Sequence, residues 1–379
     1  MQRDAPSTPR HHRQLILPQV GEEGQRRLRE SHALIVGVGA LGCVAADLLC
    51  RAGVGAITLV DRDFVEITNL QRQVLFTEAD AREGLPKAEA ARRRLEAIDS
   101  AVRVRAIVDD FNHTNAERSL DAHGADLPPV GVIVDGTDNF ETRYLLNDLA
   151  VKRGVPYIYA GVVGVSGMQM TILPRAAGGA PAQAWSGHET PCLRCLFPEA
   201  PPAGSTPTCD TAGVLGPAVA IVAATEATET IKTLMGAWGA VRRSLLSIDA
   251  WTGQTHQLAL DDATGAADCP CCSGRVFEHL EGRSASRTTS LCGRNSVQIL
   301  PGGSDNAPAR MDLRALAERL RAHGEFTSNE HMLRGAFSNE QSAAGAPIEL
   351  ALFTDGRAII KNTDSIEAAR AIYAKYVGV

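Results

Sequence analysis

The chain has 379 residues, of which 44% are hydrophobic and 22% charged, and its formal net charge is −6. It is longer than one typical domain, its composition is that of a soluble globular protein, and its acidic balance gives no basic footprint for nucleic acid. The N-terminus lacks the apolar core of a signal peptide, and the longest apolar run, residues 214–224, is interrupted by Gly216 and Pro217. We therefore expect a cytoplasmic protein of two domains that binds neither nucleic acid nor a membrane.

Strands and helices alternate through the first two thirds of the chain. Apolar strands are predicted at residues 33–36 and 56–60, on either side of a helix at 41–52. They are followed by a helix at 87–98, strands at 102–108 and 130–134, a helix at 141–153, strands at 156–160 and 168–173, a long helix at 214–234, and a hairpin of strands at 244–249 and 255–260. This alternation predicts an α/β fold with a doubly wound, Rossmann-like, mostly parallel sheet that ends in antiparallel strands.

The composition changes after residue 278, where stretches rich in Ser, Thr, Arg, Gly and Pro indicate a linker and loops. We therefore divide the chain into a first domain at residues 1–278, a linker with a first strand at 279–309, and a small α+β domain at 310–379, whose start could also lie near residue 290. Its elements are predicted as strands at 296–300, 331–336, 348–353 and 358–360, with helices at 312–322 and 365–376. Asp355-Gly356 predicts a hairpin turn between the last two strands.

A glycine-rich turn follows the first predicted strand and opens the first helix. Residues 37–42 have the G-x-G-x-x-G spacing, which lets backbone approach a phosphate at a helix N-terminus. Asp61 ends the next strand, about 20 residues on, where a carboxylate can accept a hydrogen bond from a ribose hydroxyl. By itself the turn fits a dinucleotide as well as ATP, or glycines that serve only helix–strand packing.

Two cations follow the second strand and favour ATP. Arg72 lies in Asn-Leu-Gln-Arg-Gln at residues 69–73, and Lys87 ends Gly-Leu-Pro-Lys at residues 84–87. When a carboxylate attacks the α-phosphorus, negative charge spreads over the phosphate oxygens, and an arginine fork and a lysine point charge can stabilise it. A dehydrogenase needs neither cation. The alternative is that both are ordinary solvated surface residues.

A group of polar residues at positions 135–139 follows another apolar strand. Asp135 and Asp138 should therefore emerge at the carboxyl edge of the sheet, where open α/β folds bind ligands. Such a carboxylate can hold a Mg²⁺ ion that bridges phosphates. The alternative is that these two carboxylates cap the helix that follows, and both roles can coexist.

The order of these motifs is specific. The segment Arg-His-His-Arg-Gln at residues 10–14 is followed by G-x-G-x-L-G, D-x-D at 61–63, N-L-Q-R-Q, G-x-P-K and D-x-x-D-N, and then by paired cysteines. In this order the motifs resemble the MoeB and ThiF adenylyltransferase family, which includes the ubiquitin-activating enzymes, over about residues 10–275. The resemblance implies an ATP-dependent nucleotidyltransferase that activates the C-terminal carboxylate of a small ubiquitin-like sulfur-carrier protein ending in Gly-Gly.

The resemblance also implies which residues hold the cofactors and how the subunits assemble. ATP and Mg²⁺ would be bound by Gly37, Gly39, Ala40, Gly42, Asp61, Asp63, Asn69, Gln71, Arg72, Lys87, Asp138 and Asn139. Arg72, Lys87 and Asp138 would be catalytic, and Ala40 stands where a further glycine is common. In the family the R-x-x-R-Q segment crosses a homodimer, which implies that Arg13 reaches the ATP of the neighbouring subunit and that residues 15–17 pack at the interface.

Nine cysteines in a cytoplasmic protein indicate metal binding, catalysis or burial rather than disulfides. Two clusters, at residues 192–195 and 269–272, provide thiolates for a tetrahedral structural Zn²⁺ that pins the crossover region to the end of the sheet. The family pattern implies Cys192, Cys195, Cys269 and Cys272 as ligands, with Cys271 as an alternative to either of the last two. A redox-active C-x-x-C is the other interpretation.

The remaining cysteines divide by context. Cys209 precedes the long helix, where a thiol can have a depressed pKa and act as a nucleophile. In some relatives a cysteine at this place takes the acyl group or joins sulfur transfer, and in others it is dispensable. Cys43 and Cys50 share one face of the first helix and are expected in the core. Cys292 precedes the first strand of its domain, which does not match rhodanese chemistry, so we expect an unreactive buried thiol there.

The most specific prediction is therefore that the protein adenylates a sulfur-carrier protein for the synthesis of molybdopterin, thiazole or a related product. A sulfur donor protein is a further expected partner. Three alternatives stay open. They are activation of a ubiquitin-like modifier for conjugation, a NAD-dependent oxidoreductase, and a sulfur-carrier scaffold with a vestigial ATP site. The role of the C-terminal domain is unassigned, and recruitment of the partner protein is one interpretation of it.

Overall fold

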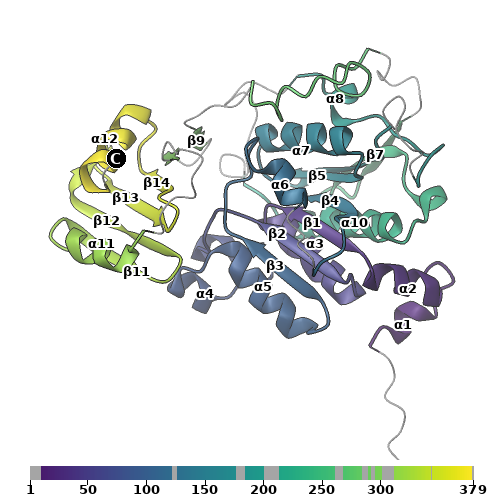
Figure 1. Cartoon of the computed structure of the whole chain (residues 1–379), viewed down its shortest axis with the longest axis horizontal. Coiled ribbons are helices and arrows are strands. Elements are labelled where there is room, and N and C mark those ends of the chain that lie inside the picture. The colour runs from purple at the N-terminus through teal and green to yellow at the C-terminus, as the bar shows by residue number, and fades with distance from the viewer. Residues whose placement is uncertain are drawn as a thin grey trace, which may run out of the picture. The chain divides into compact units, whose positions relative to one another are not determined.

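The computed structural model describes residues 10–121, 126–175, 184–199, 213–260, 268–283, 289–291, 295–300, 311–342 and 344–377. These residues form two compact units (Figure 1). The first is built from Met1–Pro201 and Gly213–Ser284, and the second contains Ala285–Val379. The boundary thus lies six residues after position 278, and the strand predicted at 296–300 pairs within the sheet of the second unit. In the described parts of the chain, no helix is both long and apolar enough to span a membrane.

The first unit contains an eight-stranded sheet in the order β3-β2-β1-β4-β5-β6-β7-β8. Its strands are β1 (His32–Val36), β2 (Ala56–Val60), β3 (Arg103–Ile107), β4 (Val132–Asp135), β5 (Tyr157–Val163), β6 (Ser166–Ile172), β7 (Ser244–Asp249) and β8 (Thr255–Ala259). The five strands from β3 to β5 are parallel, and β6, β7 and β8 are added antiparallel. The predicted mostly parallel α/β sheet with an antiparallel end is confirmed.

Helices cover both faces of this sheet. The helical segments are α1 (His12–Leu15), α2 (Gly21–Arg29), α3 (Ala40–Ala52), η1 (Ile67–Asn69), α4 (Glu78–Glu83), α5 (Lys87–Ile98), α6 (Ala116–Asp121), α7 (Phe140–Arg153), α8 (Leu193–Leu196), α10 (Gly216–Leu234) and η2 (Trp238–Ala240). Along β1, Ala33 and Ile35 pack with the cluster under α3, α5 and α10, whereas Leu34 and Val36 pack with the cluster under α6 and α7. Because both faces are covered, a strand of continuous apolar residues is stable here.

The first helix after the glycine turn carries two cysteines of the core. Cys43 and Cys50 are fully buried in the cluster beneath α3, as predicted from their seven-residue spacing. Burial raises the pKa of the Cys43 thiol to about 12, so this thiol is not a reactive thiolate at neutral pH.

The second unit is a six-stranded antiparallel sheet in the order β11-β12-β13-β14-β10-β9. Its elements are β9 (Thr289–Leu291), β10 (Ser296–Ile299), α11 (Leu313–Leu320), β11 (Gly324–Ser328), β12 (Met332–Gln341), β13 (Pro347–Phe353), β14 (Ala358–Lys361) and α12 (Ile366–Tyr376). The predicted Asp355-Gly356 turn joins β13 to β14. Strand β11 was not predicted, and β12 extends beyond the predicted end at residue 336. Both stretches are mostly polar, with one large apolar residue each (Phe326 and Phe337), and leave little apolar alternation for a sequence pattern to detect.

Candidate functional site

Three segments with candidate site residues begin side by side at the carboxyl edge of the parallel strands. Val36, the last residue of β1, is in register with Val60 of β2 on one side and with Asp135 of β4 on the other. The glycine turn, the segment from Asp61 and the segment from Gly136 therefore leave the sheet from adjacent strands. Neighbouring strand ends of this kind are where open α/β sheets bind ligands.

The glycine turn is shaped by close backbone contact with the turn after β4. Gly37 has a φ of +86°, which favours glycine, and a Cβ atom on Gly136 would lie 1.9 Å from the Gly37 carbonyl oxygen. A Cβ atom on Gly42 would lie 2.0 Å from the same oxygen. The space at Gly39 is different, because the nearest atom to a Cβ there would be 3.8 Å away. Three glycines, Gly37, Gly42 and Gly136, thus allow the close backbone contacts between the two turns, and Gly39 leaves room at the start of α3.

The start of α3 has the features of a phosphate site. Gly39 is the N-cap and Ala40 the first helical residue, and in the described structure no side chain caps the helix at this end. The first amide groups of a helix lack intrahelical acceptors and attract anions. Gly37, Gly39, Ala40 and Gly42 are thus brought together around one helix terminus.

Asp61 braces the glycine turn. Its Oδ2 atom accepts a hydrogen bond from the Val38 amide at 2.6 Å, and its Oδ1 atom accepts one from the Asp63 amide at 2.7 Å. Burial raises the pKa of the Asp61 carboxyl, whereas the charge of nearby Lys87 opposes this shift. The residue predicted to bind a ribose therefore also orders the backbone of the turn.

Lys87 is buried beside the same carboxylates. Its Nζ atom lies 3.1 Å from Asp63 Oδ2, and its backbone amide donates to the Asp63 carbonyl oxygen at 2.9 Å. A short antiparallel bridge between Phe64 and Pro86 holds the two segments together. The Asp-x-Asp and Gly-x-Pro-Lys motifs, 24 residues apart from Asp63 to Lys87, thus form one charged cluster.

The Asn-Leu-Gln-Arg-Gln segment lies against the start of α10. Asn69 is buried, and its Oδ1 atom accepts a hydrogen bond from the Glu66 amide at 3.0 Å, so it shapes the loop. Arg72 Nη1 donates to the Thr68 carbonyl oxygen at 3.1 Å. A Cβ atom on Gly216, the first residue of α10, would lie 3.1 Å from the Gln71 carbonyl oxygen. Gln71 and Arg72 are therefore adjacent to a second helix N-terminus.

Residues 135–139, at the end of β4 and in the turn that follows, differ in their burial and their contacts. Asn139 is the N-cap of α7, and its Oδ1 atom accepts a hydrogen bond from the Thr142 amide at 2.9 Å. Asp135 is completely buried, whereas Asp138 is exposed. The N-cap residue of this helix is thus Asn139, rather than Asp135 or Asp138.

Three residues of this edge were missed by sequence reasoning. Arg62 Nη1 lies 2.5 Å from Asp110 Oδ1, between the ends of β2 and β3. Gln73 is buried close to Gly39, and among the described residues its Oε1 atom has no hydrogen-bond partner. Arg143 is buried in the first turn of α7. Gln73 could have been found, because it belongs to the same motif as Arg72, but no sequence pattern indicated the other two.

Arg13 lies far from the glycine turn of its own chain. Gln14 Nε2 donates to the carbonyl oxygen of Ala52 at 2.9 Å, and Arg10 Nη1 donates to that of Ile98 at 2.7 Å, so α1 is attached at the C-terminal ends of α3 and α5. The 13 residues of α3 separate this point from the glycine turn by about 20 Å, which is much longer than an arginine side chain. Arg13 is exposed, as are Ile16 and Leu17.

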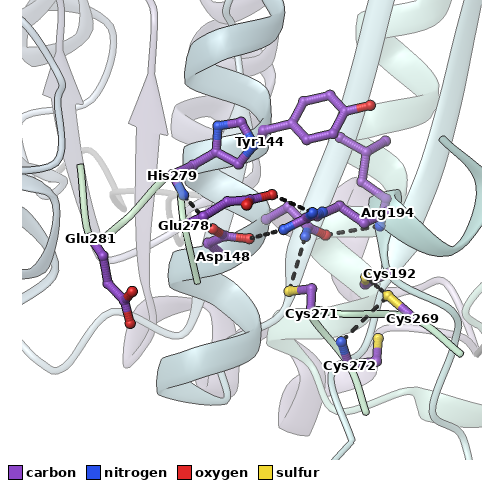
Figure 2. Close-up of polar contacts among 12 residues, drawn as sticks. Tyr144, Asp148, Cys192, Arg194, Cys269, Cys271, Cys272, Glu278, His279 and Glu281 are labelled. Atoms are coloured by element: carbon purple, nitrogen blue, oxygen red, sulfur yellow. Dashed lines mark hydrogen bonds and ion pairs between the residues drawn. The ribbon is translucent and has the colours of Figure 1, made fainter. Parts of the chain in front are cut away.

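Four cysteine sulfurs form a candidate metal centre (Figure 2). The Sγ atoms of Cys192, Cys195, Cys269 and Cys272 all lie within 4.8 Å of one another. Neighbouring sulfurs are 3.7 Å apart for Cys192 and Cys269, 3.8 Å for Cys192 and Cys195, and 3.6 Å for Cys195 and Cys272. A tetrahedron with metal–sulfur distances of about 2.3 Å has edges of about 3.8 Å, so the donor set fits a tetrahedral thiolate-bound metal ion such as Zn²⁺.

Cys271 lies outside this set of four. Its sulfur accepts a hydrogen bond from Asn147 Nδ2 at 3.4 Å, and the carboxyl of Asp148 lies nearby. Buried Arg194 faces Asp148 and pairs with Glu278, which ties the two cysteine loops to α7. Cys209 and Cys292 lie outside the described residues, so their predicted roles stay predictions.

The chain is similar to known adenylyltransferases. The sequence model of the ThiF family matches residues 11–271. The sulfur carrier protein ThiS adenylyltransferase of Bacillus subtilis is 39% identical over 98% of this chain and its own full length. The sulfur carrier protein adenylyltransferase of Thermus thermophilus is 39% identical over 69% of this chain and 90% of its own. Among solved structures, Escherichia coli MccB superposes with a TM-score of 0.56 at 23% identity, covering 73% of this chain and 75% of MccB, which shows a shared fold.

Proposed function

This chain belongs to the ThiF family, and we propose that it uses ATP to adenylate the C-terminal Gly-Gly carboxylate of a small ubiquitin-like sulfur-carrier protein. One structural observation supports this proposal above the others. The open start of α3, buried Lys87, Arg72 and the exposed carboxylate of Asp138 all belong to segments that meet at one edge of the sheet. The Bacillus subtilis relative aligns with both units, which supports assigning both to one activity.

In the proposed reaction a carboxylate oxygen of the carrier attacks the α-phosphorus of ATP. A new phosphorus–oxygen bond forms, the bond from the α-phosphorus to the bridging oxygen of the β-phosphate breaks, and pyrophosphate leaves. No general base is needed, because the attacking carboxylate is already ionised at neutral pH. Lys87 and Arg72 would stabilise the charge that develops on the phosphate oxygens, the amides at the start of α3 would hold phosphate, and Asp61 would orient the ribose.

Two sites in this chain have donor groups suited to a metal ion. Asp138 offers an exposed carboxylate next to the proposed phosphate site, the donor that a Mg²⁺ ion bound to phosphates prefers. Mg²⁺ would neutralise part of the negative charge of the phosphates. Cys192, Cys195, Cys269 and Cys272 would hold a structural Zn²⁺ with no open coordination position, so this centre would have no part in the chemistry.

We further propose that the protein acts as a homodimer in which Arg13 serves the site of the neighbouring subunit. The anchoring of α1 about 20 Å from its own glycine turn supports this proposal, because Arg13 cannot reach that turn within one chain. Exposed Ile16 and Leu17, adjacent to Arg13 in sequence, would then be covered in the dimer.

Subunit mixing tests the shared site. R13M and K87M should each be inactive as homodimers, but mixed dimers should contain one intact site, with Lys87 from one chain and Arg13 from the other. In a two-fold dimer, random mixing in equal amounts should restore roughly a quarter of wild-type exchange activity. Activity of the R13M homodimer, or no recovery on mixing under conditions where mass spectrometry detects mixed dimers, would contradict the arrangement.

The function itself is tested by ATP–pyrophosphate exchange with a panel of purified Gly-Gly-terminated carrier proteins. One carrier should stimulate exchange, and the same carrier without its last two glycines should not. If no carrier stimulates exchange and the protein binds NAD instead, the proposal is wrong and an oxidoreductase is favoured. If exchange occurs but the acyl group appears on target proteins rather than as a thiocarboxylate, the partner is a conjugated modifier.

Cys209 remains a proposed participant in the step after adenylation. Exchange requires only the adenylation step, so C209A should retain it. Loss of thiocarboxylate formation in the same variant would assign the thiol to sulfur transfer, and equal loss of both activities would contradict this assignment.

A further inference from the structure

A buried polar network lies directly beneath the turn that carries Asp138. Its central acid is Asp135, the last residue of β4, which is fully buried. Asp135 Oδ1 accepts hydrogen bonds from the Thr137 amide at 3.0 Å and the Thr137 hydroxyl at 2.6 Å. Asp135 Oδ2 accepts one from the Tyr157 hydroxyl at 2.5 Å, and the Asp135 amide donates to Glu226 Oε1 at 3.1 Å. The network therefore joins β4, β5 and α10 under the turn.

Arg143 adds the cation to this network. Its Nη2 atom donates to the Thr137 carbonyl oxygen at 2.9 Å, and its Nε atom lies 3.8 Å from Asp135 Oδ2. The guanidinium carbon lies 5.4 Å from the centre of the Phe140 ring and 5.6 Å from that of Tyr159, so two aromatic faces enclose it. Only 10% of the Arg143 side chain is exposed. The Arg143 side chain thus binds the backbone of the turn at Thr137 and also faces the Asp135 carboxylate beneath the turn.

Stability alone does not explain a buried charge at this place. Removing a guanidinium from water is costly, and replacing a buried ion pair with apolar residues of similar volume is often neutral or stabilising. Within the described structure, the Nε atom of Arg143 is buried and has no hydrogen-bond partner, so the pair is not fully compensated. The arrangement instead determines the geometry of residues 136–138, since Thr137 is held from both its amide and its carbonyl side.

That geometry matters at two points of the proposed site. Gly136, on one side of Thr137, is in backbone contact with Gly37 of the glycine turn. Asp138, on the other side, follows Thr137 directly in the chain and is exposed. Because this close contact holds Gly136, releasing Thr137 would displace mainly the Asp138 carboxylate.

We propose that Arg143, paired with Asp135, is a positioning residue that fixes the turn at residues 136–138 and through it places the Asp138 carboxylate against the nucleotide. This inference rests on the proposed adenylation function. Arg143 would affect the reaction by positioning Asp138 and would not contact the substrate.

A double-mutant cycle tests the coupling. R143M should lower kcat/KM for carrier-dependent exchange by roughly 10- to 100-fold, as for other groups that orient a ligand-binding residue. In the background of D138N, the same change should cost less than about threefold, because the carboxylate that Arg143 places is already absent. R143K should recover part of the loss in the wild-type background. Equal losses from R143M with and without Asp138 would overturn the proposal.

Structural readouts separate positioning from general damage. Amide hydrogen exchange in a peptide covering residues 136–140 should accelerate in R143M, whereas peptides from β1 and β2 should exchange as in the wild type. R153Q, on the last turn of α7, removes an exposed arginine that pairs with Asp121 and is the matched control, which should leave exchange activity unchanged. If R143M does not fold, R143K decides the question: full activity with unaltered amide exchange would overturn the role. Absence of exchange in the wild-type enzyme would instead refute the proposed function.

Discussion

Replacing Lys87 with methionine is expected to lower kcat/KM for carrier-dependent ATP–pyrophosphate exchange by roughly 100- to 1000-fold, the loss typical of removing one group that stabilises developing oxyanion charge. The ammonium group is buried 3.1 Å from Asp63 Oδ2 and close enough to Asp61 to oppose the rise in its pKa. Methionine keeps the chain length and apolar stem but removes the positive charge. Two carboxylates would then face the triphosphate without their cation, so repulsion adds to the lost stabilisation.

The controls for this prediction separate charge from folding. K87R retains the charge and should retain more activity than K87M. K152M removes an exposed lysine that lies 3.3 Å from Glu117, so it tests the loss of an ion pair away from the site and should leave activity unchanged. The melting temperature of K87M must be measured alongside, because breaking a buried ion pair is itself destabilising. A folded K87M protein within threefold of wild-type activity would remove Lys87 from the proposed mechanism.

Loss of the four-cysteine centre is expected to have the largest effect on stability. Inductively coupled plasma mass spectrometry should find about one zinc ion per chain in the wild type, and C195A should abolish this stoichiometric binding. Structural zinc contributes about 10 kcal/mol or more in small isolated sites. Even a third of that would lower the melting temperature by roughly 10 °C, at about 2–4 °C per kcal/mol for a unit of this size. A strong chelator should cause a similar loss in the wild type.

Cys271 provides a matched control for the metal prediction. It is one residue from Cys272 in sequence, but its sulfur accepts a hydrogen bond from Asn147 and is not one of the set of four. C271A should therefore keep full zinc occupancy and lose stability only at the chelator concentration at which the wild type does. Loss of zinc in C271A together with retention in C272A would reverse the assignment of the ligand set.

Most of the first unit could be predicted from its sequence because its signals are local. The apolar strand at residues 33–36, the glycine turn and the following helix are specified by residues next to one another in the chain, and the structure confirms them. The second unit was less predictable. Strand β11 (Gly324–Ser328) has one large apolar residue, Phe326, and its formation depends on pairing with β12 rather than on its own alternation.

The candidate site was predicted in part. Motif order indicated Lys87, Arg72 and Asp138, because each belongs to a short pattern with a recognisable chemistry. Arg62 and Arg143 had no such pattern, and their places depend on Asp110 and Asp135, which reach them through folding. Whether Lys87 and Arg72 act on ATP remains a proposal that the exchange experiments test.

The sequence by itself determined the alternation of strands and helices, the glycine turn at a helix start, and two pairs of cysteines with ligand spacing. These features depend on neighbouring residues, whose chemistry acts over one or two turns of chain. Only the tertiary structure decided that Gly136 contacts Gly37, that Cys271 is not one of the four clustered thiols, and that α1 is anchored about 20 Å from its own glycine turn. Such contacts join segments distant in sequence, and packing of the whole sheet and its helices selects them.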